Sequence, residues 1–545
     1  MNRFFTVFIV SLCSAMTVCG CSVFKKDFGK GGTGEQLVPK ALLRSIDPLL
    51  LQPITADATT PTTLPTTIPV AQVRLSLADA RVTALRNNLD LVVSKLDPLI
   101  ASYGITQAEA QFESTFTTSF NFAVLDTPTD SQLQGSSVKT VNLTPGIRVP
   151  LRTGGFITLS IPMGRNESDN QFQNRPLSFT SDLAINVQQP LLRGSGTDAN
   201  AERIRAAYYN TQRSESATKL QVIRVLASVD RGYWRVYAAR EELKVRLKEL
   251  DLAEAQLERA NRRVRAQAAA EIEVIRAESG VADNLERIII AENQLRDRQR
   301  ELKRILNDPE LPLESPTILV TDSPPAAIEL RIDQDALLRL AQANRMELLD
   351  AELQIAQQTA TIGAARNDFL PLVNLDYTFN VNGLGDTLPD AWDMNAEWDF
   401  IDHRVGLQVE IPIGNRAARS RLRSALARRT QLLSTKQQRL LQVRQEVLAA
   451  ADQIDANRRR VAAATRRVSL SQRLLDAEIR QFDLGLRTST EVLDAQTSLS
   501  SAQSSLVNAI TEYQIAQVDL AFATGMTVGA SRVQWEPASA PNDRR

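Results

Sequence analysis

The 545-residue chain has few of the residue types on which catalytic and metal chemistry depend. It contains one histidine, His403, and three cysteines. A metal ligand needs partners at ligand spacing, and the sequence places none beside His403, which we interpret as a surface residue or one at the end of a strand. No catalytic triad, cysteine nucleophile or phosphate loop stands in a suitable context. The sequence therefore predicts a protein that is not an enzyme and that has no cofactor and no metal site.

The cysteines Cys13, Cys19 and Cys21 all lie near the N-terminus, so the rest of the chain has no disulfide framework. Residues 1–20 have the form of a secretory signal peptide, in which a basic residue precedes the apolar run Phe4–Leu12 and small residues follow. This run is too short to span a membrane as a helix. The sequence therefore predicts a secreted or envelope protein.

Small residues directly before Cys21 resemble a bacterial lipobox. We therefore expect Cys21 to be the first residue of the mature protein and to carry a lipid. An ordinary cleavage site beside an incidental cysteine is the alternative. Ser22 stands where an aspartate would suggest retention at the inner membrane, which favours lipid anchoring in the cell outer membrane.

The chain has no excess of charge of either sign. Lysine plus arginine equals aspartate plus glutamate at 63 each, and no long block of one sign stands out. Nucleic-acid-binding proteins carry a basic patch or stripe, so we expect no nucleic acid as a partner. The glycine-rich stretch at residues 29–34 lacks P-loop spacing and follows no strand. We interpret it as part of a lipid-anchored flexible linker over residues 21–70, which are rich in Gly, Pro and Thr.

Beyond the signal peptide the sequence has no run of 18 apolar residues. The mature chain is therefore expected to have no transmembrane helix. If it crosses a membrane, it does so as strands in a closed barrel, because lipid offers no partner for open backbone groups.

The chain contains the same unit twice. LSLADARVTALRNNLDLVVSKLDP from Leu75 corresponds to LRIDQDALLRLAQANRMELLDAEL from Leu330. Later pairs keep a nearly constant separation, 218 residues for one pair and 222 for another, which indicates a true duplication. These pairs are Val274 with Val492, and Pro190 with Pro412. The predicted domains are a first repeat at 71–312, an inter-repeat linker at 313–328, a second repeat at 329–527 and a C-terminal tail at 528–545.

Each repeat contains segments that alternate between apolar and polar residues, as half-buried strands do. The second repeat has VNLDYTFNVN after Pro371 and VGLQVEIPIGNR from Val405; FESTFTTSFNFAV and SDLAINVQQPLLRGSG take these places in the first. The first repeat has further alternating segments over residues 141–163, joined across Gly154 and Gly155. They predict an additional hairpin or an extended outer loop, and the sequence leaves open whether they join the other strands.

Long helices follow these strands. Residues from Ala199 to about Ala266 contain no proline, and at about 1.5 Å per residue they predict a rod of roughly 100 Å. An interruption at the midpoint predicts that each repeat ends in a helical hairpin with its turn far from the strands. A narrow apolar seam marks helices that pack closely. Its expected members are Leu243, Leu247, Leu250, Leu257 and Val264 in one hairpin and Leu499, Ala502, Leu506, Ile510, Tyr513 and Leu520 in the other.

The segment Phe482–Gly525, FDLGLRTSTEVLDAQTSLSSAQSSLVNAITEYQIAQVDLAFATG, resembles the second helical hairpin of TolC-like outer-membrane efflux and secretion proteins. The resemblance extends over both repeats, about residues 72–310 and 329–526. It implies an outer-membrane channel subunit of a tripartite efflux or type I secretion system, a passive conduit with its helical part in the periplasm. The implied partners are two further copies in a homotrimer, a periplasmic adaptor (membrane fusion) protein, an inner-membrane transporter and outer-membrane lipid. A structural periplasm-spanning coiled-coil lipoprotein without a pore is the alternative.

A count of strands favours the same trimer over a dimer or a tetramer, which only the resemblance excludes. Two strands per repeat give four per chain, too few to close, whereas three chains give twelve, which could leave an open lumen. The predicted fold class is mainly α with a β membrane portion: a duplicated strand-and-long-helix repeat, with a trimeric 12-stranded β-barrel continued by an α-helical coiled-coil tunnel. The cargo, whether a drug, a metal ion or a protein, stays open.

The second tip carries the candidate site residues. In the resembled family, acidic residues matching Glu491 and Asp494 narrow the periplasmic entrance, and an arginine matching Arg487 holds the gate shut. Glu491 stands three residues after Thr488, which is also the spacing of a helix capping box, so a local role for Glu491 is the alternative. Residues expected to contact the adaptor are Gly485, Leu486 and Thr488.

Three further positions carry weaker expectations. Gln267 stands at the first tip where the family often has glycine, which puts a left-handed turn there in doubt. Trp392 and Trp398 flank a predicted strand, and we expect them either at a membrane interface or packed in the preceding loop.

Overall fold

The computed structural model describes residues 71–128, 135–170, 172–267, 270–325 and 332–531. The predicted signal peptide, the linker 21–70, Cys21 and the tail from residue 532 lie outside the described residues. The strands are β1 (Gln72–Leu75), β2 (Thr115–Asp126), β3 (Ser137–Pro150), β4 (Phe156–Ser160), β5 (Met163–Ser168), β6 (Leu177–Pro190), β7 (Ile318–Thr321), β8 (Leu372–Gly385) and β9 (Ile401–Glu410).

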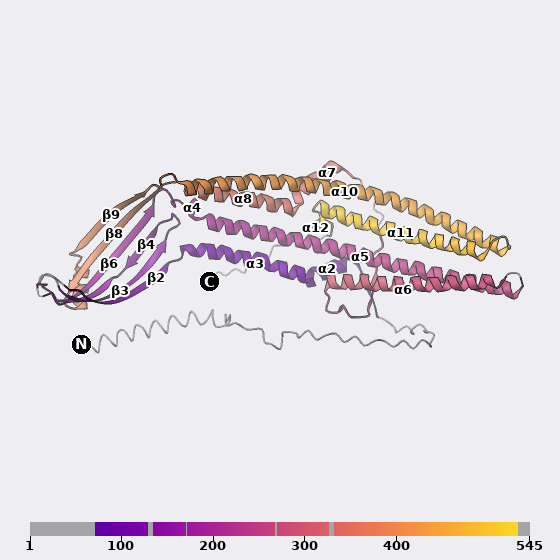
Figure 1. The fold of residues 1–545 in the computed structure, drawn as a ribbon, viewed down its shortest axis with the longest axis horizontal. Helices are drawn as coiled ribbons and strands as arrows, with labels where there is room; N and C mark the ends of the chain where they lie inside the picture. The colour runs from indigo at the N-terminus through magenta and orange to yellow at the C-terminus, as the bar shows by residue number, and fades with distance from the viewer. Residues whose placement is uncertain (1–70, 129–134, 171, 268–269, 326–331, 532–545) are drawn as a thin grey trace. The chain divides into compact units, whose positions relative to one another are not determined.

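Helices make up most of the described chain and alternate with the strands in the same order in both repeats (Figure 1). The helices are α2 (Leu77–Asn87), α3 (Leu89–Glu109), the 3-10 turn η2 (Ala110–Phe112), α4 (Thr197–Asn200), α5 (Glu202–Arg265), α6 (Ile272–Leu306), α7 (Gln334–Asn344), α8 (Met346–Asn367), α9 (Leu388–Glu397), α10 (Arg416–Asp483), α11 (Ser489–Ala523) and α12 (Thr527–Ala530).

Two helical hairpins, α5 with α6 and α10 with α11, dominate the helical part (Figure 1). The helices α5 and α10 contain 64 and 68 residues, so their lengths are about 96 and about 102 Å at the usual rise. Neither contains proline. In α11 the predicted seam residues Leu499 and Tyr513 are buried, whereas Leu247 of α5 is 45% exposed. The predicted rods and hairpins are therefore confirmed, and the predicted seam includes one residue that does not pack.

The duplication is visible in how the short helices begin. The hydroxyl of Ser76 accepts a hydrogen bond from the backbone N–H of Asp79 at the start of α2. Asp333 accepts bonds from Asp335 and Ala336 at the start of α7. Such caps satisfy backbone donors that have no partner inside the helix. In both repeats the capped helix leads into a longer one, α3 or α8.

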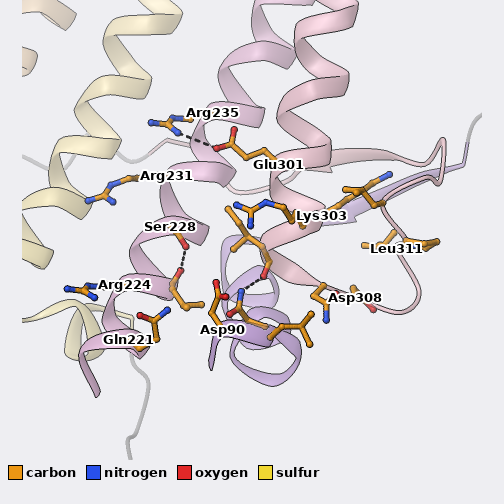
Figure 2. Close-up of a pocket in the computed structure, with 18 residues that line it drawn as sticks. Asp90, Gln221, Arg224, Ser228, Arg231, Arg235, Glu301, Lys303, Asp308 and Leu311 are labelled. Atoms are coloured by element: carbon orange, nitrogen blue, oxygen red, sulfur yellow. Dashed lines mark hydrogen bonds and ion pairs between the residues drawn. The ribbon is translucent and has the colours of Figure 1, made fainter. Parts of the chain in front are cut away.

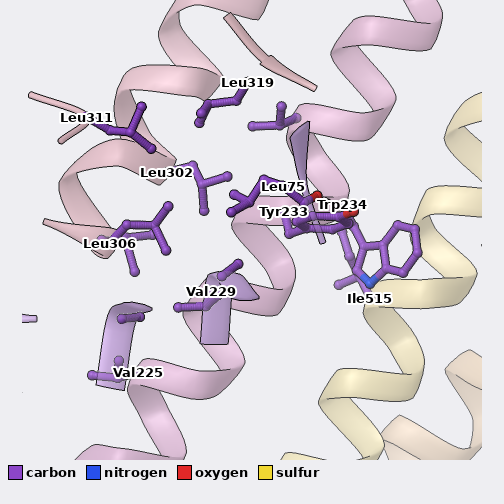
Figure 3. Close-up of a cluster of buried hydrophobic side chains, with 14 of the residues drawn as sticks. Leu75, Val225, Val229, Tyr233, Trp234, Leu302, Leu306, Leu311, Leu319 and Ile515 are labelled. Atoms are coloured by element: carbon purple, nitrogen blue, oxygen red, sulfur yellow. Dashed lines mark hydrogen bonds between the residues drawn. The ribbon is translucent and has the colours of Figure 1, made fainter. Parts of the chain in front are cut away.

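The largest buried core surrounds Tyr233 of α5, where α2, α6 and the parallel pair β1–β7 meet it (Figure 3). The Tyr233 hydroxyl donates to the Leu75 carbonyl (3.1 Å) and accepts from the Ser323 N–H (2.9 Å). Arg81 donates two hydrogen bonds of 2.7 Å to the buried carboxylate of Asp230. This core holds β1, α2 and β7 against the middle of α5.

One antiparallel sheet contains every strand except β1 and β7, in the order β2, β3, β4 with β5, β6, β8, β9 (Figure 1). Strands β4 and β5 follow one another in the same position between β3 and β6, separated by Ile161 and Pro162. The segments over 141–163 therefore join the sheet. Two strands per repeat hold for the second repeat, but the first supplies four strand positions, so the described part of this sheet has six positions.

The alternation gives the sheet one apolar and one polar face over most of its length, although β5 places Arg165 and Glu167 on the apolar side. In β9, Val405, Leu407 and Val409 point to one side, while Arg404 and Gln408 point to the other. The predicted architecture, mainly helical with a β portion built on a duplicated strand-and-helix repeat, is confirmed.

Helix α9 lies where the sequence predicts a loop. It begins with a capping box at Thr387 and packs on β8 and β6. Asn395 donates to the Ser181 carbonyl (3.0 Å), and the α9 backbone leaves no room for a Cβ at Gly383. The indole of Trp392, on α9, is 39% exposed. Among the described residues, no helix is both long and apolar enough to cross a membrane.

Candidate functional site

The turn between α10 and α11 reverses the chain within five residues, Leu484–Thr488. Gly485 adopts φ +80°, a backbone conformation that favours glycine. Its N–H donates to the Phe482 carbonyl, and the N–H of Leu486 donates to the Gln481 carbonyl, both at 2.9 Å. These bonds close the end of α10 in the manner of a glycine C-cap. The turn exposes the Leu486 side chain, which is 73% accessible.

Glu491 caps the helix that follows the turn. The backbone N–H of Thr488 donates to Glu491 Oε2 (2.7 Å), and the Thr488 hydroxyl donates to the same oxygen (3.2 Å). The reciprocal bond of a capping box is also present, so Thr488 is the N-cap of α11. The local role considered for Glu491 therefore exists in this chain.

Arg487 joins the two helices of the tip. Its guanidinium donates to Glu491 Oε1 (2.6 Å) and to Gln481 Oε1 (2.9 Å), and it lies 3.4 Å from Glu478. The bond from the Thr488 N–H, followed by the bond from Arg487, holds the pKa of Glu491 below its ordinary value. The bond to Glu491 correspondingly raises the pKa of Arg487. Glu491 and Arg487 thus form a charged clamp across the turn.

Asp494 is different, although it lies only one helical turn from Glu491. It is exposed on α11, and among the described residues it has no hydrogen bond or ion pair. Of the two predicted gate acids, one is therefore engaged within the chain and the other is free to meet a ligand or a second copy.

The first tip ends next to the second, and its residues tie the two hairpins together. Arg263 donates to the Phe482 carbonyl (2.8 Å), and its guanidinium lies 4.6 Å from the centre of the Phe482 ring. Glu273 accepts from the backbone N–H of Ser489 (3.0 Å). Sequence reasoning missed these residues, since their contacts join segments more than 200 residues apart. Gln267 adopts φ +57° at this tip, so the turn is left-handed without glycine.

Farther from the tips, Glu249 connects three helices. Its side chain is 3% exposed and accepts from Arg246 (2.9 Å), Arg287 (2.9 Å) and the Ser500 hydroxyl (2.6 Å). Arg246 is held in addition by Glu242 at 2.6 Å. This network links α5 to both α6 and α11, and it too was missed in the sequence.

Two further polar features of the described residues, the surroundings of His403 and a pocket beside α5, lie away from the tips. Nδ1 of His403 lies 3.0 Å from the Tyr377 hydroxyl in the sheet. In the part of the chain that the structure describes, no group of three or more His, Cys, Asp or Glu residues could hold a metal ion. A pocket of about 620 Å³ opens between α5, α6 and the start of α3 (Figure 2). Some of its charges are used within the chain, since Arg235 lies 3.6 Å from Glu301 and Lys303 donates to the Ser315 carbonyl.

The fold and the tips together define a class: a duplicated protein with one antiparallel sheet and two helical hairpins that end in adjacent turns. Residues 337–526 match the model of a family described as "Outer membrane efflux protein". This match confirms the predicted resemblance to TolC-like proteins over residues 337–526, most of the second repeat. No protein of curated function matches the chain in sequence.

Solved structures share the fold over most of the chain. A membrane protein from Pseudomonas aeruginosa is 20% identical, with a TM-score of 0.62, 82% of this chain covered and 93% of that one. VceC from Vibrio cholerae, an outer membrane protein, is 16% identical, with a TM-score of 0.61 and coverages of 82% and 96%. The open state of the MtrE outer membrane channel from Neisseria gonorrhoeae is 16% identical, with a TM-score of 0.57 and coverages of 89% and 99%.

Proposed function

We propose that this chain is the outer-membrane channel subunit of a tripartite efflux or type I secretion system. Three copies would form a passive conduit to the exterior, docked by their tips on a periplasmic adaptor and an inner-membrane transporter. The observation that carries the proposal is the coupling of a two-faced antiparallel sheet to helices of about 100 Å. A spacer without a pore has no use for a sheet with one apolar and one polar face.

The strand count no longer argues for three copies, because two chains with six strands each would already supply twelve. The trimer therefore depends on the family relationship. The domain division into repeats at 71–312 and 329–527, with a linker at 313–328 and a tail at 528–545, is part of the same proposal.

The lipid anchor is proposed at Cys21, which lies outside the described residues. It predicts that the mature protein begins with an acylated cysteine and fractionates with outer membranes. Intact-mass spectrometry of the purified protein tests this. A mature N-terminus at any other residue would contradict the anchor and leave the channel function standing.

We place the periplasmic gate at the second tip, with Asp494 as its cation-binding group. Three copies would bring three free Asp494 carboxylates toward one axis, and clustered carboxylates attract cations. Glu491 would contribute less, since its oxygens already accept from Thr488 and Arg487. Arg487 would hold the closed tip in shape by clamping the turn.

Single-channel recording with a multivalent cation at low salt tests the gate. Asp494→Asn should weaken the block more than Glu491→Gln does, and Arg487→Ala should raise the basal conductance. Asp452→Asn, which changes an exposed acid on α10 far from the tip, is the matched control. If Asp494→Asn and the control show the same block as the unaltered protein, the gate lies elsewhere.

The adaptor contact is proposed at the same turn. Thr488 is occupied as a helix cap and Gly485 shapes the backbone, which leaves Leu486 as the side chain that can meet a partner. Leu484 beside it is 75% exposed, so the two leucines present an apolar surface. Leu486→Glu should reduce co-purification of the adaptor while the channel keeps its conductance.

A further inference from the structure

We propose that each chain contributes six strands to the membrane wall, so that three copies close an eighteen-stranded barrel. Its wide outer lumen would admit cargo larger than a twelve-stranded barrel could pass. The inference rests on the proposed channel function and adds to it the size class of the cargo.

The two additional strand positions lie inside the sheet. β2 pairs with β3 over twelve residues, from Thr115 with Arg148 to Asp126 with Ser137. On the other side, β6 pairs with β4 and β5. In the described sheet β2 and β6 do not pair with each other, since β3 and the β4–β5 position stand between them. The additional strands thus cannot leave the wall without separating β2 from the rest.

The difference in length between the two repeats matches the additional strands. Ser76 and Asp333, the caps of α2 and α7, lie 257 residues apart, whereas Pro190 and Pro412 lie 222 apart. The first repeat is therefore 35 residues longer between these points. Two strands and their turns require about that many residues at the lengths observed for β3, β4 and β5.

Side-chain alternation runs in phase across all six positions in the part of the sheet that contains β4. Farther along, β5 places Arg165 and Glu167 on the apolar face. One lateral row on the apolar face consists of Phe116, Ile147, Leu159, Ile185, Phe379 and His403. The next row, on the opposite face, consists of Thr117, Gly146, Ser160, Ala184, Asn380 and Asp402. Strands of a membrane barrel alternate between apolar residues toward lipid and polar residues toward the lumen. Strands β3 and β4 obey this pattern in phase with their neighbours, which a hairpin outside the membrane would not need.

The edges of the sheet fit closure by other copies of the chain. β2 and β9 each leave one long side unpaired among the described residues, and open backbone edges are not tolerated in lipid. Five successive antiparallel pairings make β2 and β9 run in opposite directions. β2 of one copy can therefore pair with β9 of the next as one more antiparallel step, and the ring closes without a parallel junction.

The width follows from the strand number. Strands about 4.8 Å apart and tilted by about 40° each occupy roughly 6.3 Å of circumference. Eighteen strands give a backbone diameter of about 36 Å, against about 24 Å for twelve. After roughly 5 Å for each side-chain layer, the lumens are about 26 Å and about 14 Å.

Electron cryomicroscopy of the full-length protein in lipid nanodiscs tests the count directly. We expect a trimer with eighteen strands, with β3 and the β4–β5 position between β2 and β6. A trimer with a twelve-stranded wall, or a dimer with twelve, would overturn the inference and leave the channel function intact. A particle without any barrel would refute both.

Polymer exclusion gives an independent measurement of the lumen. Polyethylene glycol of about 20 Å diameter, added on the outer side in a planar bilayer, should enter the unaltered channel and lower its conductance. Deletion of residues 127–168 removes β3, β4 and β5, while Asp169–Pro176 remains to join β2 to β6. This variant should exclude the same polymer. Equal polymer size limits for both proteins would contradict the proposal. If the variant does not fold, the unaltered channel alone still tests the proposal, because its exclusion of the polymer would contradict a wide lumen.

Discussion

Replacing Glu249 should loosen the contact between the two helical hairpins. The side chain is almost fully buried and accepts hydrogen bonds from Arg246, Arg287 and Ser500, on three different helices. Glu249→Gln keeps the shape of the side chain but removes its charge. Both arginines then lose their shared partner in the interior.

The magnitude follows from these contacts. Removing one partner of a buried ion pair costs about 3–5 kcal/mol. Two features favour the lower end of this range for Glu249→Gln. Arg246 keeps its ion pair with Glu242 at 2.6 Å, and Arg287 is 42% exposed and can reach water. We therefore expect about 3 kcal/mol of lost local stability, or roughly a 100-fold loss of protection against hydrogen exchange.

Hydrogen–deuterium exchange of the full-length protein measures this effect in peptides from α5 and α11. Glu258→Gln is the matched control, because Glu258 lies on the same helix with its side chain 72% exposed. An exposed substitution should change local stability by no more than about 0.5 kcal/mol. Equal exchange in the two variants would refute the stabilising role of the network.

Further predictions concern the second tip and the central core. Gly485→Ala should destabilise the turn by about 1–2 kcal/mol, seen as faster exchange at the tip, because alanine resists φ +80°. The folded-state pKa of Glu491 lies below 4.5, its ordinary value. The bond between Glu491 and Arg487 is therefore present above pH 4.5 and is lost only as the pH falls through the lower folded-state pKa. Channel conductance should not change between pH 7 and 5.5. Arg81→Met should cost about 3–5 kcal/mol in chemical unfolding because it leaves Asp230 buried and unpaired, and Arg81→Met with Asp230→Leu should recover most of that loss.

Local signals made the helices and the second tip predictable. Proline and glycine mark their ends, and the Thr488–Glu491 spacing alone predicts the observed capping box. The position of the additional strands was not predictable, because strand pairing is non-local and either a hairpin or a loop fits their alternation. The contacts of Glu249 and Arg263 were missed for the same reason, since their partners lie on another hairpin.

The two left-handed turns illustrate the same limit. Gly485 signals its conformation by residue type, whereas Gln267 adopts φ +57° although its side chain disfavours it. Residue type alone therefore identified the second turn and left the first in doubt.

The central claim is that this chain forms a passive conduit, and one experiment tests it most directly. Purified full-length protein is measured by native mass spectrometry and then reconstituted in a planar bilayer. We expect a lipid-bearing trimer that gives stepwise conductance without an energy source. A stable monomer that forms no conducting steps would contradict the claim.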